Sequence, residues 1–168
     1  AEVEWNNLAS LDVSSHLLGA EALQILLDAP SLTGQLRALN LFSNALDDQE
    51  IVALSQSELL SQLRSLSLSI WRLSRETLKK LFTSPSVEQM LSLDFGHNGN
   101  EHLTEVLLSS KLTSLRRLYI PRVEMTPKLA RRFVESSALP SLRELECATF
   151  NLSPESREIL CSRFHLIE

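Results

Sequence analysis

A repeat of about 27 residues runs through this 168-residue chain and restricts the folds it can adopt more than any other feature. In one clear copy, leucines stand at positions 36, 39 and 41, which are offsets 0, 3 and 5 of the motif. Apolar residues recur at the same offsets in five further segments, which begin at Leu8, Leu63, Met90, Leu115 and Leu142. Successive copies begin 25 to 28 residues apart, so the chain is predicted to consist of six similar units.

Helix-start signals recur with the same period, although they use different residue types. Asp47 is followed three residues later by Glu50, a pair that can close a capping box. Thr126 and Ser153 each stand directly before a proline, which favours the first helical position. The predicted helix starts are Gly19, Asp47, Ser74, Asn100, Thr126 and Ser153. Apolar residues spaced by three and four follow each start, so every unit is predicted to contain a short strand and a helix.

These features resemble the leucine-rich repeat family, whose consensus is L-x-x-L-x-L-x-x-N/C-x-L. The match spans about residues 5–164, and a period of about 27 with a helix in each unit is similar to the ribonuclease-inhibitor-like class. The resemblance implies an α/β fold: a right-handed β-α solenoid in a horseshoe arc of about six repeats, with a parallel sheet on the concave side and helices on the convex side. Residues 1–168 would then form a single leucine-rich repeat domain, which could be a fragment of a larger protein.

The sequence departs from this consensus at the asparagine position. The position is held by Asn44 and Asn98 in two units and by His16, Trp71, Val123 and Phe150 in the others. Family members use the asparagine to bond the backbone of the turn, and His16 is expected to do the same. Where the position is apolar, other groups must satisfy the backbone hydrogen bonds of the turn. No polar capping sequence is recognisable at either end of the array. The end strands are therefore expected to pack on something else or to stack into a homodimer.

Alternation along each strand predicts which side chains stay exposed. Offsets 0, 3 and 5 point into the core, so offsets 2, 4 and 6 lie on the other side of the sheet, which we call the open face. In the first four units the open face carries mostly small and polar residues, with Phe42 as the large exception. In the last two units it carries charges and the one tyrosine of the chain.

The charged part of the open face is the candidate binding site. Neighbouring strands lie about 4.8 Å apart, so Arg117 is expected beside Glu144 and within reach of Glu146, with Asp94 near Tyr119. The charges could form only an exposed salt-bridge network, or Tyr119 and Arg117 could anchor a partner, as these residue types often do. The predicted partner-binding residues are Asp94, Arg117, Tyr119, Glu144, Glu146 and, as an outlying anchor that could equally fold under a turn, Phe42.

No cofactor-binding or metal site is predicted. The four glycines form no GxGxxG or GxxxxGK[ST] phosphate loop, and the serines lie in no GxSxG motif. A zinc site at His97 and His102 would need a third ligand such as Glu101 or Glu105, and we expect none.

No catalytic residues are predicted either. Glu144 and Glu146 have a spacing that some glycoside hydrolases use, but an open, shallow face gives no cleft for a sugar. Arg117 beside them would also keep both carboxylates ionised, which removes the general acid. Cys147 and Cys161 are predicted to be buried free thiols.

The leading functional hypothesis is therefore a non-enzymatic protein–protein interaction module that binds a protein partner through its concave sheet face. The alternative is a structural spacer or substrate-recognition arm of a larger, effector-type or ligase-type multidomain protein. A net charge of −5 and a pI near 5.4 disfavour nucleic acid, and no apolar run approaches the ~20 residues that span a membrane. Free cysteines and the absence of a recognisable leader favour the cytoplasm, with leaderless secretion as an effector the alternative.

Overall fold

A single parallel sheet organises the molecule. The computed structural model describes residues 7–32, 34–69, 73–96, 102–147 and 152–167. Within these ranges, seven strands pair in chain order to form one open, all-parallel sheet. They are β1 (Ser10–Asp12), β2 (Ala38–Asn40), β3 (Ser65–Ser67), β4 (Ser92–Asp94), β5 (Arg117–Ile120), β6 (Glu144–Cys147) and β7 (His165–Leu166).

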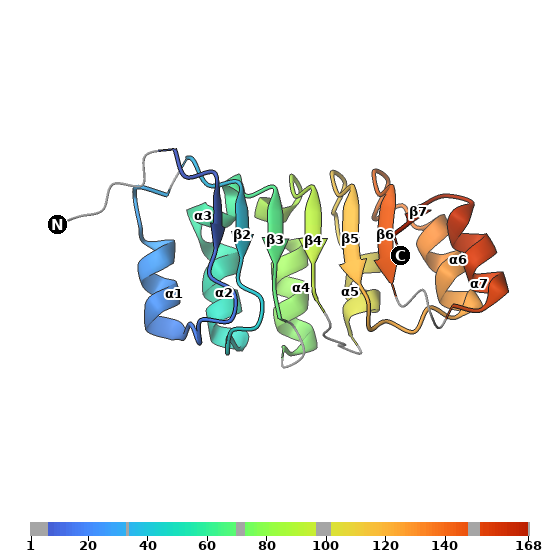
Figure 1. The fold of residues 1–168 in the computed structure, drawn as a ribbon, viewed down its shortest axis with the longest axis horizontal. Coiled ribbons are helices and arrows are strands. Elements are labelled where there is room, and N and C mark those ends of the chain that lie inside the picture. The colour runs from blue at the N-terminus through green and yellow to red at the C-terminus, as the bar shows by residue number, and fades with distance from the viewer. Residues whose placement is uncertain (1–6, 33, 70–72, 97–101, 148–151, 168) are drawn as a thin grey trace.

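Helices follow the sheet along one side, as Figure 1 shows. They are α1 (Ala20–Leu27), α2 (Asp48–Gln56), α3 (Glu58–Gln62), α4 (Arg75–Thr83), α5 (Leu103–Leu108), α6 (Pro127–Glu135) and α7 (Pro154–Cys161), with a 3₁₀ turn, η1 (Pro85–Val87), before β4. The predicted α/β class with a parallel sheet is confirmed. Strand β7 was not predicted from the sequence, because two residues are too few to show an alternating pattern.

Leucines stack in register across the sheet and form the core. Leu39 pairs with Leu66, and the same column continues through Leu93, Leu118 and Leu145. Each of these side chains is at most 2 % exposed, so the predicted inward offset is confirmed. Burial of one leucine stabilises the fold by about 1.5–3 kcal/mol, so the repeated column is a main source of stability.

Most predicted helix starts are confirmed by their capping bonds. Asp47 and Glu50 form a capping box, in which Glu50 Oε2 accepts from the Asp47 amide at 2.9 Å. The hydroxyls of Ser74, Thr126 and Ser153 accept from backbone amides three residues later. Gly19 precedes α1 and has no side chain to form a cap. The predicted start Asn100 lies outside the described residues, and α5 begins after His102, whose side chain forms no capping bond.

Asn44 ties the first two units together. Its Oδ1 accepts from the amides of His16 at 3.2 Å and Leu18 at 2.9 Å, and its Nδ2 donates to the carbonyls of Val13 and Leu41. His16 bonds the turn backbone as predicted, because its Nδ1 lies 2.5 Å from the Ser14 carbonyl oxygen. A single amide side chain thus satisfies four backbone groups that belong to two neighbouring turns.

The other asparagine positions differ. Val123 is buried, and its turn is closed by a backbone bond from its own amide to the Ile120 carbonyl. Trp71, Asn98 and Phe150 lie outside the described residues.

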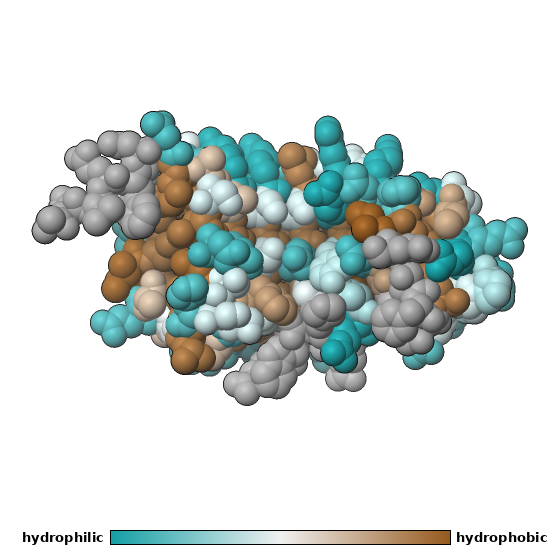
Figure 2. Space-filling model, viewed as in Figure 1, coloured by the Kyte–Doolittle hydropathy of each residue, from teal (hydrophilic) through white to brown (hydrophobic). Residues whose placement is uncertain are grey.

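The two ends of the sheet are finished differently. In the first unit Leu11 and Val13 are only half-buried, while Leu17 and Ile25 are 86 % and 67 % exposed. Figure 2 shows hydrophobic surface gathered at this end, around α1.

None of the helices that the structure describes has the length and hydrophobicity that a bilayer-spanning segment needs.

At the C-terminal end, Arg163 closes the last turn of α6. Its guanidinium donates to the carbonyls of Phe133, Ser136 and Leu139 at 2.7–3.2 Å and also to that of Val134. The prediction of two buried thiols is wrong for one of them, because Cys147 is buried but Cys161 is exposed. Cys161 follows the fully buried Leu160 on α7, and one helical step of about 100° turns it away from the core.

Candidate functional site

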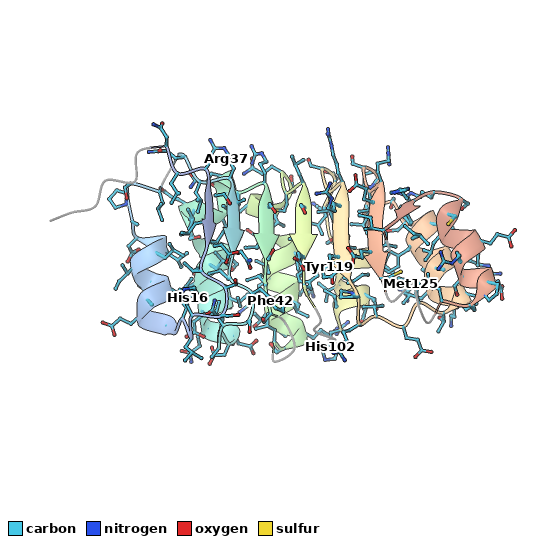
Figure 3. The ribbon with its side chains drawn as sticks, viewed as in Figure 1. His16, Arg37, Phe42, His102, Tyr119 and Met125 are labelled. Carbon is cyan, nitrogen blue, oxygen red and sulfur yellow. The ribbon has the colours of Figure 1, made fainter. Side chains whose placement is uncertain are left out.

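Five of the six predicted binding residues lie together on the open face of β4, β5 and β6. The register pairs Asp94 with Tyr119 and Tyr119 with Glu146, so these three form one row across the strands. Arg117 pairs with Glu144 in the adjacent row. Tyr119 projects from β5 near the middle of the molecule (Figure 3). The leucine register that builds the core therefore also assembles this charged group.

Arg117 and Glu144 form the ion pair that the strand spacing predicts. Arg117 Nε donates to Glu144 Oε2 at 2.5 Å, and the two side chains are 59 % and 36 % exposed. The hydrogen bond from Arg117 holds the pKa of Glu144 below its ordinary value, and the nearby His165 lowers this pKa further. Glu144 is therefore ionised at neutral pH and cannot act there as a general acid.

Tyr119 occupies a half-buried position between two carboxylates. Burial raises the pKa of its phenol above the ordinary value, and the charges of Glu146 and then Asp94 raise this pKa further. The phenol is therefore protonated at neutral pH, and it lies in the negative potential of its neighbours.

Asp94, Tyr119 and Glu146 line a hollow of about 430 Å³. On one side lie the small serines of β3 and β4, and on the other the larger side chains of β5 and the residues beyond it. The lining residues are Ser65, Ser67, Ser92, Asp94, Arg117, Leu118, Tyr119, Glu146 and Ile167. Small side chains on β3 and β4 beside larger ones on β5 leave this space open.

Asp94 has a structural role that the sequence analysis missed. Its Oδ1 accepts from the Gly96 amide at 2.7 Å, and its Oδ2 accepts from Ser67 Oγ at 3.4 Å. The same bond to the amide two residues later recurs at offset 4, from Ser14 to Asp12 and from Phe42 to Asn40. An Asp or Asn at offset 4 in three units was the available signal, because these residues close turns in this way. Asp94 therefore belongs both to a turn and to the hollow.

Phe42 does not join the other five residues. It is half-buried rather than exposed, and its ring lies where a side chain at Gly96 would be, so any Cβ there would collide with it. Ser69, between them on the neighbouring unit, is small and buried. The ring therefore folds across the sheet onto the positions where the neighbouring residues are small.

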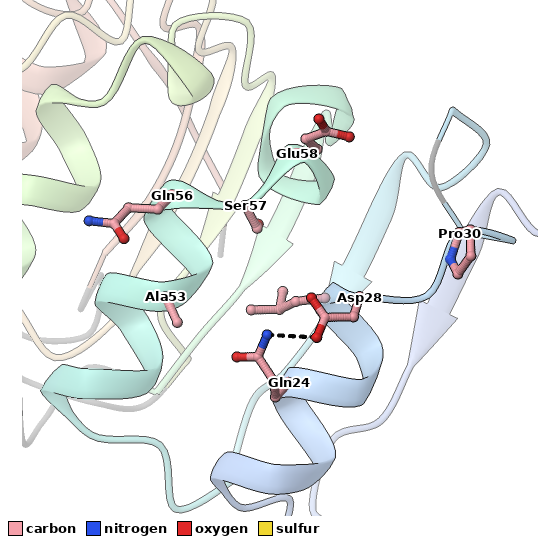
Figure 4. A pocket seen from close by; sticks show the side chains of 8 residues that line it. Gln24, Asp28, Pro30, Ala53, Gln56, Ser57 and Glu58 are labelled. Atoms are coloured by element: carbon pink, nitrogen blue, oxygen red, sulfur yellow. Dashed lines mark hydrogen bonds between the residues drawn. The ribbon is translucent and has the colours of Figure 1, made fainter.

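A second depression, of about 530 Å³, lies on the helix side between α1 and the junction of α2 and α3 (Figure 4). Gln24 Nε2 donates to Asp28 Oδ2 at 2.8 Å at its edge. The lining residues are Gln24, Leu27, Asp28, Pro30, Ala53, Gln56, Ser57 and Glu58. The sequence analysis missed this depression.

The described residues contain no cluster of metal ligands, and the buried thiol among them is not activated. No group of three or more His, Cys, Asp or Glu side chains there could hold a metal ion. His97 and Glu101 lie outside the described residues. Burial raises the pKa of the Cys147 thiol to about 11, so it is protonated and unreactive at neutral pH.

Comparison with known proteins yields a structural likeness only. No model of a known protein family matches the chain, and no curated protein matches its sequence. The C-terminal domain of tropomodulin from Caenorhabditis elegans is similar in structure, with a TM-score of 0.55 and 18 % sequence identity over 82 % of this chain and 86 % of that chain. At this identity the likeness concerns the fold alone, and together with the parallel sheet it supports a leucine-rich-repeat-like solenoid.

Proposed function

We propose that this chain is a leucine-rich repeat protein of the ribonuclease-inhibitor-like class that binds a protein partner through its open face without catalysing a reaction. The sheet would form the concave side of a right-handed horseshoe arc of about six repeats. The observation that carries the proposal is the hollow beside Tyr119. It gathers Asp94, Arg117 and Glu146 around a half-buried aromatic ring, away from the core.

Energetics support a binding role for this surface. Tyrosine and arginine are common among the residues that dominate binding energy at interfaces, because they supply large contact areas and directed hydrogen bonds. The residues also sit on strands whose leucines are almost fully buried, so the surface loses little conformational entropy when a partner docks. The ion pair of Arg117 with Glu144 orients the guanidinium before binding.

The test is partner capture by the intact chain compared with two matched variants. The first variant combines Tyr119→Ala with Arg117→Ala. The control combines Lys79→Ala with Lys80→Ala on the outer surface of α4, where both side chains are exposed. We expect a partner identified by pull-down and mass spectrometry to be lost with the first variant and retained with the control. Unchanged capture by a correctly folded first variant would show that the open face is not the site.

The alternative proposal is a spacer or substrate-recognition arm of a larger effector-type or ligase-type protein. The exposed Leu17 and Ile25 support it, since large apolar side chains at the end of a stack favour contact with another part of a protein. The same surface could instead pair two copies of this chain. Sedimentation of the wild type against a Leu17→Ser and Ile25→Ser variant tests the dimer, which would dissociate in the variant.

The proposal further includes a cytoplasmic location, no cofactor and no binding of nucleic acid or membrane. The net charge of −5 opposes association with a polyanion. The absence of salt-dependent binding to duplex DNA or to anionic vesicles would support this part of the proposal.

A further inference from the structure

The hollow on the open face carries an excess of negative charge. Asp94 and Glu146 line it with two carboxylates, whereas Arg117 supplies one guanidinium, which already bonds the neighbouring Glu144. Glu144 and its neighbour His165 lie beside the hollow and not in its lining, and the other lining residues are uncharged. The charge that complements this surface is therefore positive.

The negative charge is concentrated around Tyr119. Asp94 and Glu146 flank it in the same row of the sheet, and the fields of both carboxylates reach its phenol, as the raised pKa indicates. A cation over an aromatic ring is attracted by the ring itself as well as by neighbouring carboxylates. The two attractions therefore coincide at one place on the open face.

The shape of the hollow favours a planar cation on a long side chain. A guanidinium can stack on an aromatic ring and bond a carboxylate with two parallel hydrogen bonds, whereas an ammonium acts as a point charge. Ser65, Ser67 and Ser92 leave space next to Tyr119, and their hydroxyls can bond the backbone of an extended chain.

We infer that the hollow receives an arginine side chain from an extended segment of the partner protein, with its guanidinium over Tyr119 and between Asp94 and Glu146. This inference rests on the proposed function, because it specifies which chemical group of the partner enters the same site.

Tyr119 makes a direct test practical, because the chain contains one tyrosine. Replacement by 3-fluorotyrosine places a single fluorine signal in the hollow. The probe is the blocked peptide acetyl-GSRSG-amide, compared with peptides that carry lysine, citrulline or glutamate in place of arginine. We expect the arginine peptide to shift the signal saturably and with a lower Kd than the lysine peptide. The citrulline peptide, which has nearly the same shape but no charge, should leave the signal unchanged.

Two variants locate the effect. Asp94→Asn combined with Glu146→Gln should raise the Kd of the arginine peptide at least about tenfold, because both carboxylates are lost while the side-chain sizes are kept. The control is Asp12→Asn, which removes a charge at the same offset on β1, outside the hollow. It should change the Kd by less than about twofold.

Several outcomes would overturn the inference. Equal responses to the arginine and citrulline peptides would remove the role of charge, and equal weakening by the Asp12→Asn control would remove the role of the hollow. A preference for the glutamate peptide would mean that Arg117 recognises an acidic group of the partner instead. An equal shift with spermidine would make the hollow a site for free polycations instead of a protein segment.

A failure of the arginine assignment can be distinguished from a failure of the proposed function. If the arginine peptide does not bind but the Tyr119→Ala and Arg117→Ala variant still loses its partner, only the arginine assignment is wrong. If that variant keeps its partner, the open face is not the partner site, whatever the peptides do.

Discussion

The first and the last units of this molecule close the same sheet in opposite ways. At the N-terminal end, Leu11 and Val13 are half-buried, and Leu17 and Ile25 are largely exposed. At the C-terminal end, β7 adds a short strand, and Arg163 satisfies carbonyls in the last turn of α6 and just after it. In a stacked array each unit is stabilised mainly by its neighbours, so a unit with one neighbour depends on what else covers it. The comparison therefore predicts a weak first unit and a firm C-terminal end.

The largest expected effect distinguishes the middle of the array from its first unit. Leu93→Ala should lower the free energy of unfolding by about 4 kcal/mol, because the side chain is fully buried and leaves a cavity. Leu11→Ala, at the same offset on β1, should cost only about 1.5 kcal/mol, since this side chain is half exposed already. Urea denaturation monitored by circular dichroism measures both values. Equal losses would mean that the first unit is as well covered as the fourth.

The connection between the first two units gives the next effect. Asn44→Ala should cost about 3 kcal/mol, because it leaves buried backbone groups in two turns without partners. Asn40→Ala is the matched control. This half-buried amide bonds an exposed carboxylate and one turn amide, so its loss should cost less than about 1 kcal/mol. Hydrogen exchange should also show early loss of protection at β1 in Asn44→Ala, and uniform loss throughout the sheet would contradict the idea of a separable first unit.

At the opposite end, Arg163→Met should cost about 2 kcal/mol, because methionine keeps part of the apolar stem but loses the bonds to carbonyls in the last turn of α6 and just after it. The control Arg132→Met removes an exposed charge from α6 itself and should change stability by less than about 0.5 kcal/mol. Faster hydrogen exchange at α7 and β7 would identify the end that loosens. If the two variants were equally stable, Arg163 would not be what holds that end.

The sequence predicted best those regions whose interactions follow from the repeat, and least those that depend on partners far away in the sequence. The leucine columns and the Arg117–Glu144 pair depend on strand register, and a motif whose internal offsets are the same in every unit determines register without further information. Arg163 could not be recognised in advance, because its acceptors lie 24 to 30 residues earlier and are backbone atoms that any residue could supply.

Phe42 shows a second limit of the same kind. Its offset correctly predicts the open face, but the direction of its ring depends on small residues in the next two units, at Ser69 and Gly96. Cys161 shows a third, since a change of one helical position decides between core and solvent. Backbone periodicity was thus readable from the sequence, whereas the choice of side-chain direction required the neighbouring units to be in place.

The smallest expected effect concerns Tyr119, which lies in the well-packed part of the sheet and should therefore keep a fixed environment up to high pH. We expect spectrophotometric titration of this single tyrosine to give a pKa above its ordinary value of 10.0. Because the folded state holds the phenolic proton more tightly than the unfolded state, the associated stability is fully present below pH 10 and is lost as the pH rises through the raised pKa. Glu146→Gln should lower this pKa, Asp94→Asn should lower it less, and neither should remove the shift, since burial is its largest cause. An ordinary pKa in the wild type would mean that the phenol is in solvent, and the hollow would then lose the partly buried ring on which its binding role depends.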